Sequence, residues 1–152
     1  MHAKAGGDLP SLAVRRRGWK YPGVEEVGAA EMVLVDTSIW VSLLRERDDR
    51  LVSLLEEGVV CSHPFVIGEL ACGNLNNRME ILSLLRALPS AEVVEHEEIL
   101  AFIDSKQLMG KGLGYVDVHL LGSAVLSGVS LWTADHRLAE SATRLGICYG
   151  SS

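Results

Sequence analysis

The sequence predicts an α/β fold in which short buried strands alternate with helices around a mostly parallel sheet. Two observations lead to this prediction. Short apolar runs recur along the chain and end in polar turns, and the segments between them place apolar residues at helical spacing. Strands that alternate with helices are typical of parallel sheets, whose right-handed crossovers put helices on both faces. We therefore expect a three-layer α/β/α sandwich with a central sheet of four to five short strands.

The segment 32–38, Met-Val-Leu-Val-Asp-Thr-Ser, is the centre of this expected arrangement. Its apolar run stops abruptly at Asp36, which is typical of a buried strand with an acid at its carboxyl end. The next segment, 39–44, is expected to be a helix capped by Thr37 or Ser38. Ligands of parallel sheets bind beyond the carboxyl ends of the strands, so Asp36 lies where chemistry would occur. The alternative is that Asp36 only caps the helix.

The other expected elements follow from the same patterns. Glycine and proline mark several of their ends. Further strands are expected at 59–61, 91–95, 129–133 and 147–149. Further helices are expected at 51–57, 65–72, 78–88, 97–109, 115–126 and 135–145.

The 152 residues are about enough for one domain. Residues 1–31 show no sustained periodicity, so we expect a poorly ordered N-terminal extension followed by a single domain at 32–152. One hypothesis is that Met32 is the true start of the protein, which the intact mass of the natively expressed protein would test. No apolar run approaches the roughly 20 residues that span a bilayer. We therefore expect a cytoplasmic protein without a membrane partner.

Charge is unevenly distributed along the chain. The net charge is −6, and residues 1–31 hold five Lys and Arg against four Asp and Glu, which leaves −7 on residues 32–152. An acidic body does not bind nucleic acid through a broad basic face. A polyanionic substrate would need metal ions or a few local Lys and Arg residues to offset the repulsion.

Four acids occupy positions that a purely structural sequence would rarely give to all of them. Asp36 and Asp135 each follow an apolar strand, Asp117 lies in the first turn of a nearly apolar helix, and Glu69 is the one charged residue of the segment 66–72. The expected topology brings all four to one edge of the sheet. Each also has a structural alternative: Asp135 as a helix cap, Asp117 as a favourable first-turn acid, and Glu69 at a rim that reaches solvent.

Such a cluster favours a metal ion. Two carboxylates about 5 Å apart repel by roughly 3 kcal/mol at an effective dielectric constant of about 20. A divalent cation reverses the sign of this interaction, and oxygen ligands select Mg²⁺ or Mn²⁺. Such an ion lowers the pKa of a bound water and neutralises charge on a phosphate. The cluster therefore predicts metal-dependent phosphodiester hydrolysis with water as the nucleophile.

Four short blocks of the sequence resemble the motifs of PIN-domain ribonucleases. They are Val35-Asp36-Thr37-Ser38, Glu69 within a helix that begins with proline, Tyr115-Val116-Asp117, and Leu131-Trp132-Thr133-Ala134-Asp135. Their order and spacing are similar to those of VapC-type toxins of toxin-antitoxin modules. The resemblance covers about residues 32–149.

The resemblance implies a Mg²⁺-dependent endoribonuclease that forms a homodimer and is inhibited by a cognate antitoxin protein. It suggests Asp36, Glu69, Asp117 and Asp135 as the metal-binding catalytic acids. Thr37, Ser38 and Thr133 match polar motif positions and could orient these acids or their waters.

Lys111, on the loop before Asp117, is a candidate for contact with the RNA backbone, with an ordinary loop lysine as the alternative. His119 lies two residues after Asp117, on another face of the helix, which favours a structural or surface role. Two rival functions are a PIN-fold protein-binding module without catalysis and a DNA-directed flap-type nuclease or exonuclease.

Overall fold

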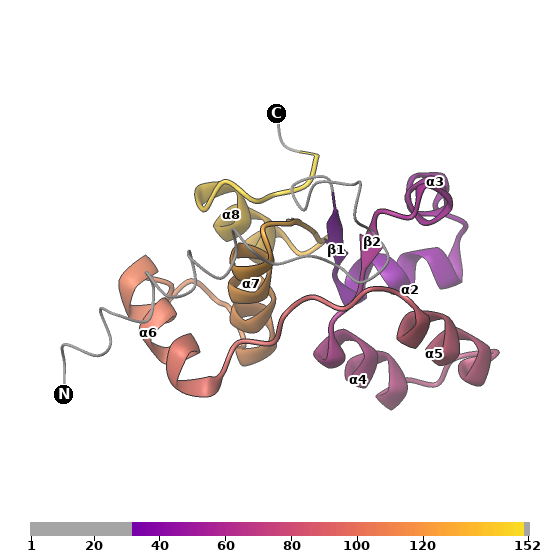
Figure 1. Cartoon of the computed structure of the whole chain (residues 1–152), viewed down its shortest axis with the longest axis horizontal. Coiled ribbons are helices and arrows are strands. Elements are labelled where there is room, and N and C mark those ends of the chain that lie inside the picture. The colour runs from indigo at the N-terminus through magenta and orange to yellow at the C-terminus, as the bar shows by residue number, and fades with distance from the viewer. Residues whose placement is uncertain (1–31, 151–152) are drawn as a thin grey trace.

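A computed structural model describes residues 32–150, so the prediction for residues 1–31 lies outside the described part of the chain. Three strands and seven helices make up this part (Figure 1). The strands are β1 (Val33–Val35), β2 (Val60–Cys61) and β3 (Ser130–Trp132). The helices are α2 (Thr37–Arg45), α3 (Asp49–Glu57), α4 (Pro64–Cys72), α5 (Arg78–Ala87), α6 (His96–Lys106), α7 (Tyr115–Ser127) and α8 (His136–Arg144).

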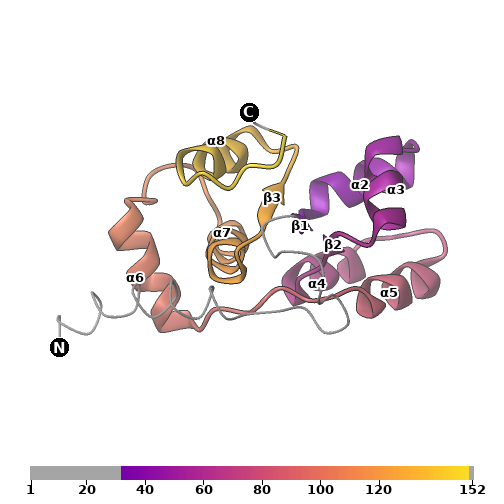
Figure 2. The ribbon, with the colours of Figure 1, turned by 45° about the horizontal axis from the view of Figure 1, so that its top comes forward.

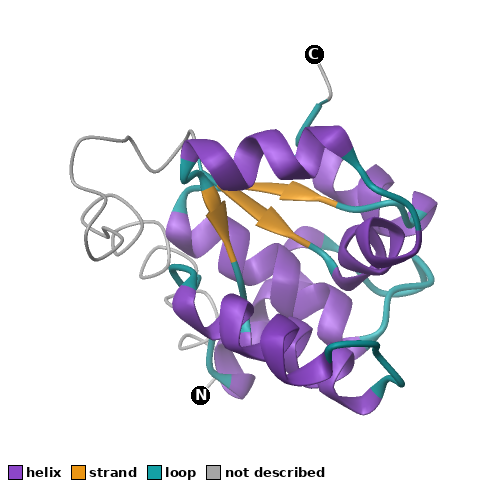
Figure 3. Ribbon diagram, turned by 90° about the vertical axis from the view of Figure 1, so that its right-hand side faces the viewer, coloured by secondary structure: helices purple, strands orange, loops and turns teal. Residues whose placement is uncertain are grey.

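The three strands form a parallel sheet in the order β2-β1-β3. The backbone N–H of Val33 donates to the carbonyl oxygen of Val59 at 2.8 Å on one side of β1. The N–H of Asp36 donates to the carbonyl oxygen of Trp132 at 2.9 Å on the other side. All three residues of β1 are buried, and helices cover both faces of the sheet (Figure 3). The predicted α/β class with a parallel sheet between helices is therefore confirmed.

The predicted number of four to five strands is wrong for the described residues. Segment 91–95 forms no strand, and the chain contacts the sheet there through a single bridge between Ser90 and Ser62. The N–H of Glu92 then donates to the Ser127 hydroxyl at 3.0 Å, so the backbone turns to a helix instead of continuing along β2. Segment 147–149 likewise contributes one bridge, between Cys148 and Leu131.

The helices lie in two groups beside the strands. In Figure 1, α6, α7 and α8 lie to the left of β1, whereas α2, α3 and the pair α4 and α5 lie to its right. The view in Figure 2 keeps the same division. The sheet therefore lies between two helical groups. None of the helices within residues 32–150 is both long and apolar enough to cross a bilayer.

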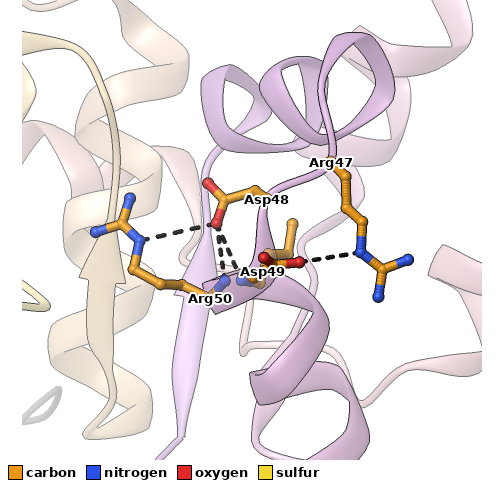
Figure 4. A network of polar contacts seen from close by, with 5 residues as sticks. Arg47, Asp48, Asp49 and Arg50 are labelled. Carbon is orange, nitrogen blue, oxygen red and sulfur yellow. Dashed lines mark hydrogen bonds and ion pairs between the residues drawn. The ribbon is translucent and has the colours of Figure 1, made fainter.

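Local capping explains where α3 begins and ends. Oδ1 of Asp48 accepts the backbone N–H groups of Arg50 and Leu51, at 3.0 and 3.3 Å, and lies 3.7 Å from Nε of Arg50 (Figure 4). Asp48 thus satisfies two N–H groups that have no partner within the helix. Gly58 ends the helix with a φ of +74°, a left-handed conformation that glycine adopts readily.

Candidate functional site

The candidate site lies at the edge of the sheet where the parallel strands end. β1 leads directly into Asp36 and α2, β2 leads into α4, and β3 leads into Asp135 and α8. Because parallel strands end on the same side of a sheet, these three helices begin next to one another. The edge therefore receives side chains from segments that lie up to about a hundred residues apart in the sequence.

Asp36 is held at this edge by two hydroxyl groups. Its side chain is only 7% exposed, and Oδ2 accepts hydrogen bonds from Ser38 Oγ at 2.8 Å and from Thr133 Oγ1 at 2.7 Å. Asp36 occupies the N-cap position of α2 but makes no capping hydrogen bond with its side chain. The alternative role of Asp36 as a simple helix cap is therefore wrong. The prediction that Thr37 or Ser38 caps α2 is also wrong, because both lie inside the helix.

The hydroxyls that hold Asp36 are themselves fixed by the loop after β3. The backbone N–H of Ala134 donates to Ser38 Oγ at 3.0 Å, and that of Asp135 donates to Thr133 Oγ1 at 3.0 Å. Both hydroxyls thus accept one backbone hydrogen bond and donate to the same carboxylate. This arrangement joins the start of α2 to the end of β3 and fixes the orientation of Asp36.

Glu69 projects from the second turn of α4, and its side chain is exposed. Oε1 accepts a hydrogen bond from Thr37 Oγ1 at 2.7 Å, which joins α4 to the first turn of α2. Glu69 therefore occupies a rim position that reaches solvent, as the structural alternative stated. Glu69 is nevertheless tied to the residue that directly follows Asp36.

Asp117 and Asp135 each stabilise the start of a helix. Oδ2 of Asp117 accepts the N–H of Gly114 at 2.9 Å, and Oδ1 of Asp135 accepts the N–H groups of Arg137 and Leu138 at 2.9 and 3.1 Å. Both structural alternatives are therefore correct descriptions of the local geometry. Within residues 32–150, the second oxygen of each carboxylate makes no hydrogen bond, so capping leaves one oxygen of each acid available to a ligand.

The four acids interact electrostatically. The pKa of Asp117 is raised above its ordinary value, mainly because partial burial disfavours the charged carboxylate. The N–H of Gly114 opposes this shift, and the negative charges of Asp36, Asp135 and Glu69 add to it. The charges of the other three acids all repel the carboxylate of Asp117, so the fold brings the four acids into one region of negative potential.

The donor chemistry of this region suits a hard divalent cation. All four side chains offer carboxylate oxygens, the ligands that Mg²⁺ and Mn²⁺ prefer. Across residues 32–150, no three Asp, Glu, His or Cys side chains are arranged as ligands of a single ion. The four acids are therefore electrostatically coupled without forming a closed ligand shell.

The loop between α6 and α7 lies before Asp117 and carries Lys111. Lys111 is exposed. Gly110 and Gly112 flank Lys111 with φ values of +70° and +77°. Arg137 lies against Gly112 and was not among the residues predicted for the site. The glycines of this loop gave no signal in the sequence that an arginine would contact them.

A buried histidine beside the site was also missed. His63 caps α4 through Nδ1, which accepts the N–H of Phe65 at 3.0 Å. The ring proton therefore lies on Nε2, which donates to Ser123 Oγ at 2.9 Å. Burial, together with a smaller contribution from His119, lowers the pKa of His63 to about 4, so the ring is neutral at pH 7. The sequence Ser-His-Pro at the start of a helix was the available signal.

His119 is buried, in agreement with a structural role, and packs edge-on against Phe65 and Tyr115 at ring-centroid distances of 4.7 and 4.5 Å. Burial and the neighbouring His96 lower its pKa. These contacts join the first turn of α4 to the first two turns of α7. They support the backbone on which Glu69 and Asp117 are placed.

Comparison with known families identifies the fold and the motifs together. The sequence profile of the PIN domain family matches residues 33–143, which include every candidate residue from Asp36 to Asp135. The chain belongs to the PIN-domain family. The match begins at β1 and ends within α8, so it covers the whole sheet and the edge that carries the acids.

Relatives of this PIN domain include proteins named Ribonuclease VapC32 from two strains of Mycobacterium tuberculosis, CDC 1551 / Oshkosh and ATCC 25618 / H37Rv. Each is 45% identical over 117 residues, which are 76% of this chain and 94% of the relative. The resemblance to VapC-type PIN proteins is therefore confirmed over most of the chain.

Solved structures with the same PIN fold are more distant in sequence. One is VapBC-1 from nontypeable Haemophilus influenzae, with a TM-score of 0.58, 16% identity, and coverage of 74% of this chain and 93% of that one. Another is PAE2754 from Pyrobaculum aerophilum, with a TM-score of 0.52, 17% identity, and coverage of 84% and 96%. At these identities the likeness supports the fold alone.

Proposed function

We propose that this PIN domain is a Mg²⁺-dependent endoribonuclease, with Mn²⁺ as a possible substitute, and that it is the toxin of a toxin-antitoxin pair. The observation that carries the proposal is the position of the acids at the edge where the parallel strands end. Asp36 and Asp135 follow β1 and β3, and Glu69 is hydrogen-bonded to Thr37 beside Asp36. The negative charges of these three acids also act on Asp117. The 45% identity to proteins named Ribonuclease VapC32 supports RNA as the substrate.

In this proposal Asp36, Glu69, Asp117 and Asp135 hold the divalent ion. When bound, the ion lowers the pKa of a water molecule and offsets the charge of the scissile phosphate. The acids orient this centre through their free oxygens, while the oxygens already hydrogen-bonded keep each side chain in place. Because the carboxylates repel one another without a cation, the ion also removes an unfavourable interaction.

Three hydroxyl residues are proposed as positioning residues. Ser38 and Thr133 hold Oδ2 of Asp36 from two sides, and Thr37 holds Oε1 of Glu69. Hydrogen bonds to metal-binding carboxylates fix their direction, and losing such a bond typically lowers activity or metal affinity by about 10- to 100-fold. Lys111 is proposed to contact the RNA backbone from its exposed loop.

Two protein partners belong to the proposal. A cognate antitoxin would inhibit the enzyme at the acidic edge. The identity to proteins named Ribonuclease VapC32 and the fold shared with VapBC-1 support an antitoxin partner. A second copy of the chain would form a homodimer. An RNA substrate and an antitoxin produced alongside the enzyme would both be met in the cytoplasm, which is the compartment we propose.

The test is cleavage of total cellular RNA and of a matched DNA by the purified protein in Mg²⁺, in Mn²⁺ and in EDTA. We expect RNA cleavage that EDTA abolishes. Asp36→Asn should lower the rate by more than about 100-fold, a loss of about 2.7 kcal/mol of transition-state stabilisation, with an unchanged circular dichroism spectrum. Cleavage of DNA alone would instead favour a flap-type nuclease or exonuclease. No cleavage and no effect of metal on stability would favour a protein-binding module.

A further inference from the structure

The side chain of Arg137 lies against the backbone of Gly112, in the loop that precedes Asp117. A Cβ atom built on Gly112 would lie 2.6 Å from Cδ, 2.8 Å from Nη1 and 3.0 Å from Nε of Arg137. A side chain at position 112 would therefore require the Arg137 side chain to move. The φ of +77° at Gly112 also favours glycine. The backbone angle and the proximity of Arg137 therefore both favour glycine at position 112.

This contact connects the two segments that carry Asp117 and Asp135. Arg137 is the second residue of α8, and its backbone N–H donates to Oδ1 of Asp135. Gly112 lies two residues before Gly114, whose N–H donates to Oδ2 of Asp117. The Arg137 side chain therefore extends from the acid at the start of α8 to the loop that leads into the acid of α7.

The charge of Arg137 is not neutralised within the described part of the chain. Its side chain is exposed, and its guanidinium forms no ion pair or hydrogen bond with residues 32–150. Four carboxylates occupy the same edge, yet none of them pairs with it. An exposed guanidinium that is held in place by its stem and keeps its donors free is suited to an anionic ligand from outside.

A phosphodiester group is the anion that matches this position. The planar guanidinium presents parallel N–H donors that fit two phosphate oxygens at once. Residues 32–152 carry a net charge of −7, so an RNA strand needs local cations to approach the acidic edge. Resting the stem on Gly112 removes side-chain freedom before binding, which lowers the entropic cost of forming the contact.

We infer that Arg137, held on Gly112, binds a backbone phosphate of the RNA beside the four-acid edge. This inference rests on the proposed function, because it assigns a substrate contact to the same site. The competing explanation is that Arg137 only covers the loop. In that case its removal would lower stability and leave RNA binding unchanged.

The experiment measures fluorescence anisotropy of a labelled 20-nucleotide single-stranded RNA of mixed sequence, in Mg²⁺, over a series of salt concentrations. Every protein carries Asp36→Asn so that the RNA stays intact. We expect Arg137→Gln to raise the Kd about 10-fold. It should also reduce the slope of log K against log salt by about 0.7, the value for one lost phosphate contact on a single strand. Arg137→Lys keeps the positive charge without the planar guanidinium. Its Kd should lie between those of the parent protein and of Arg137→Gln.

Two matched controls separate binding from folding. Gly112→Ala displaces the Arg137 stem, whereas Gly110→Ala introduces a methyl group at a similar φ of +70° with nothing within 4 Å. We expect Gly112→Ala to weaken binding as Arg137→Gln does, and Gly110→Ala to bind like the parent. Arg86→Gln, which removes an exposed charge from the last turn of α5, should also bind like the parent.

Unchanged affinity and salt slope in Arg137→Gln would overturn the inference, whatever its melting temperature. So would a loss of affinity that Gly110→Ala and Arg86→Gln share equally, or an absence of RNA binding by the parent. Cleavage of the same RNA by the protein with Asp36 intact is measured in parallel. Cleavage that persists in Arg137→Gln, together with unchanged binding, rejects the role of Arg137 alone. Absence of cleavage with intact Asp36 rejects the proposed function instead.

Discussion

The hydroxyl of Thr37 donates a 2.7 Å hydrogen bond to Oε1 of Glu69 and so links the first turn of α2 to the second turn of α4. Thr37 directly follows Asp36, so this bond fixes the position of one acid relative to another. Glu69 is exposed, so burial does little to fix the orientation of its side chain. The hydroxyl is therefore the contact that holds Glu69 toward the edge of the sheet.

Thr37→Val should lower RNA cleavage by about 10-fold, because Glu69 loses the donor that orients it. Thr37→Ser keeps the donor and should retain most of the activity. The measurement is the initial rate of RNA cleavage as a function of Mg²⁺ concentration. We expect Thr37→Val to require more Mg²⁺ for half-maximal activity. Equal Mg²⁺ dependence in all three proteins would show that Thr37 does not position a metal ligand.

Thr133→Val removes a donor to Asp36 and also the acceptor of the Asp135 N–H. We expect a loss of about 1 kcal/mol in the free energy of unfolding, since the bond to Asp36 is partly buried. Cleavage should fall at the same time, because two of the four acids lose an orienting contact. Urea unfolding and cleavage rates measure the two effects, with Thr133→Ser as the control. A Thr133→Ser protein as impaired as Thr133→Val would contradict this role of the hydroxyl.

Asp117→Asn should stabilise the protein in EDTA at pH 7.5. The pKa of Asp117 is raised by partial burial and by its three acidic neighbours, so its charged form is unfavourable in the folded state. Removing that charge removes the penalty, and the asparagine can still accept the N–H of Gly114. Thermal melts in EDTA measure the difference. An Asp117→Asn protein that melts below the wild type under these conditions would argue against repulsion at this edge.

Mg²⁺ should stabilise the wild type more than Asp117→Asn. An ion present at ten times its Kd stabilises the folded state by about 1.4 kcal/mol. We expect this gain in the wild type and a smaller one in Asp117→Asn, which has lost a charged ligand. Melting curves over a Mg²⁺ titration measure it. Identical gains in the two proteins would place the bound ion away from Asp117.

His63 should make stability depend on pH. Its pKa is about 4 in the folded protein against an ordinary value of 6.5, so the unfolded chain takes up this proton first as the pH falls. The stability contributed by neutral His63 is complete above pH 6.5 and is lost between pH 6.5 and 4, to an extent of about 3 kcal/mol. His63→Asn keeps an acceptor for the Phe65 N–H and should flatten this dependence. Equal slopes in urea unfolding between pH 7 and pH 5 would contradict the assignment.

The sequence alone predicted the α/β class and most element positions, because strand and helix patterns are local. The helix predicted at 78–88 is observed as α5, Arg78–Ala87, and the strand predicted at 129–133 as β3, Ser130–Trp132. Segments 91–95 and 147–149 have the composition of strands but share only one bridge each with the sheet. Pairing of edge segments depends on where neighbouring helices direct the chain, which composition does not encode.

The grouping of the four acids could be predicted from topology, since parallel strands end at one edge. Their burial could not. Within the apolar segment 66–72, a rim position that reaches solvent was only the alternative for Glu69, yet helix α4 turns that side chain outward to the Thr37 hydroxyl. The contact of Arg137 with Gly112 was also beyond sequence reasoning, because it joins positions 25 residues apart through the shape of a loop.

In the proposed function, the four carboxylates share a divalent cation at the edge of the sheet. Anomalous diffraction at the manganese absorption edge, from crystals grown with Mn²⁺, tests it most directly. We expect a peak about 2 Å from carboxylate oxygens of Asp36 and of at least one of Glu69, Asp117 and Asp135. Saturating Mn²⁺ with no peak among these side chains would contradict it.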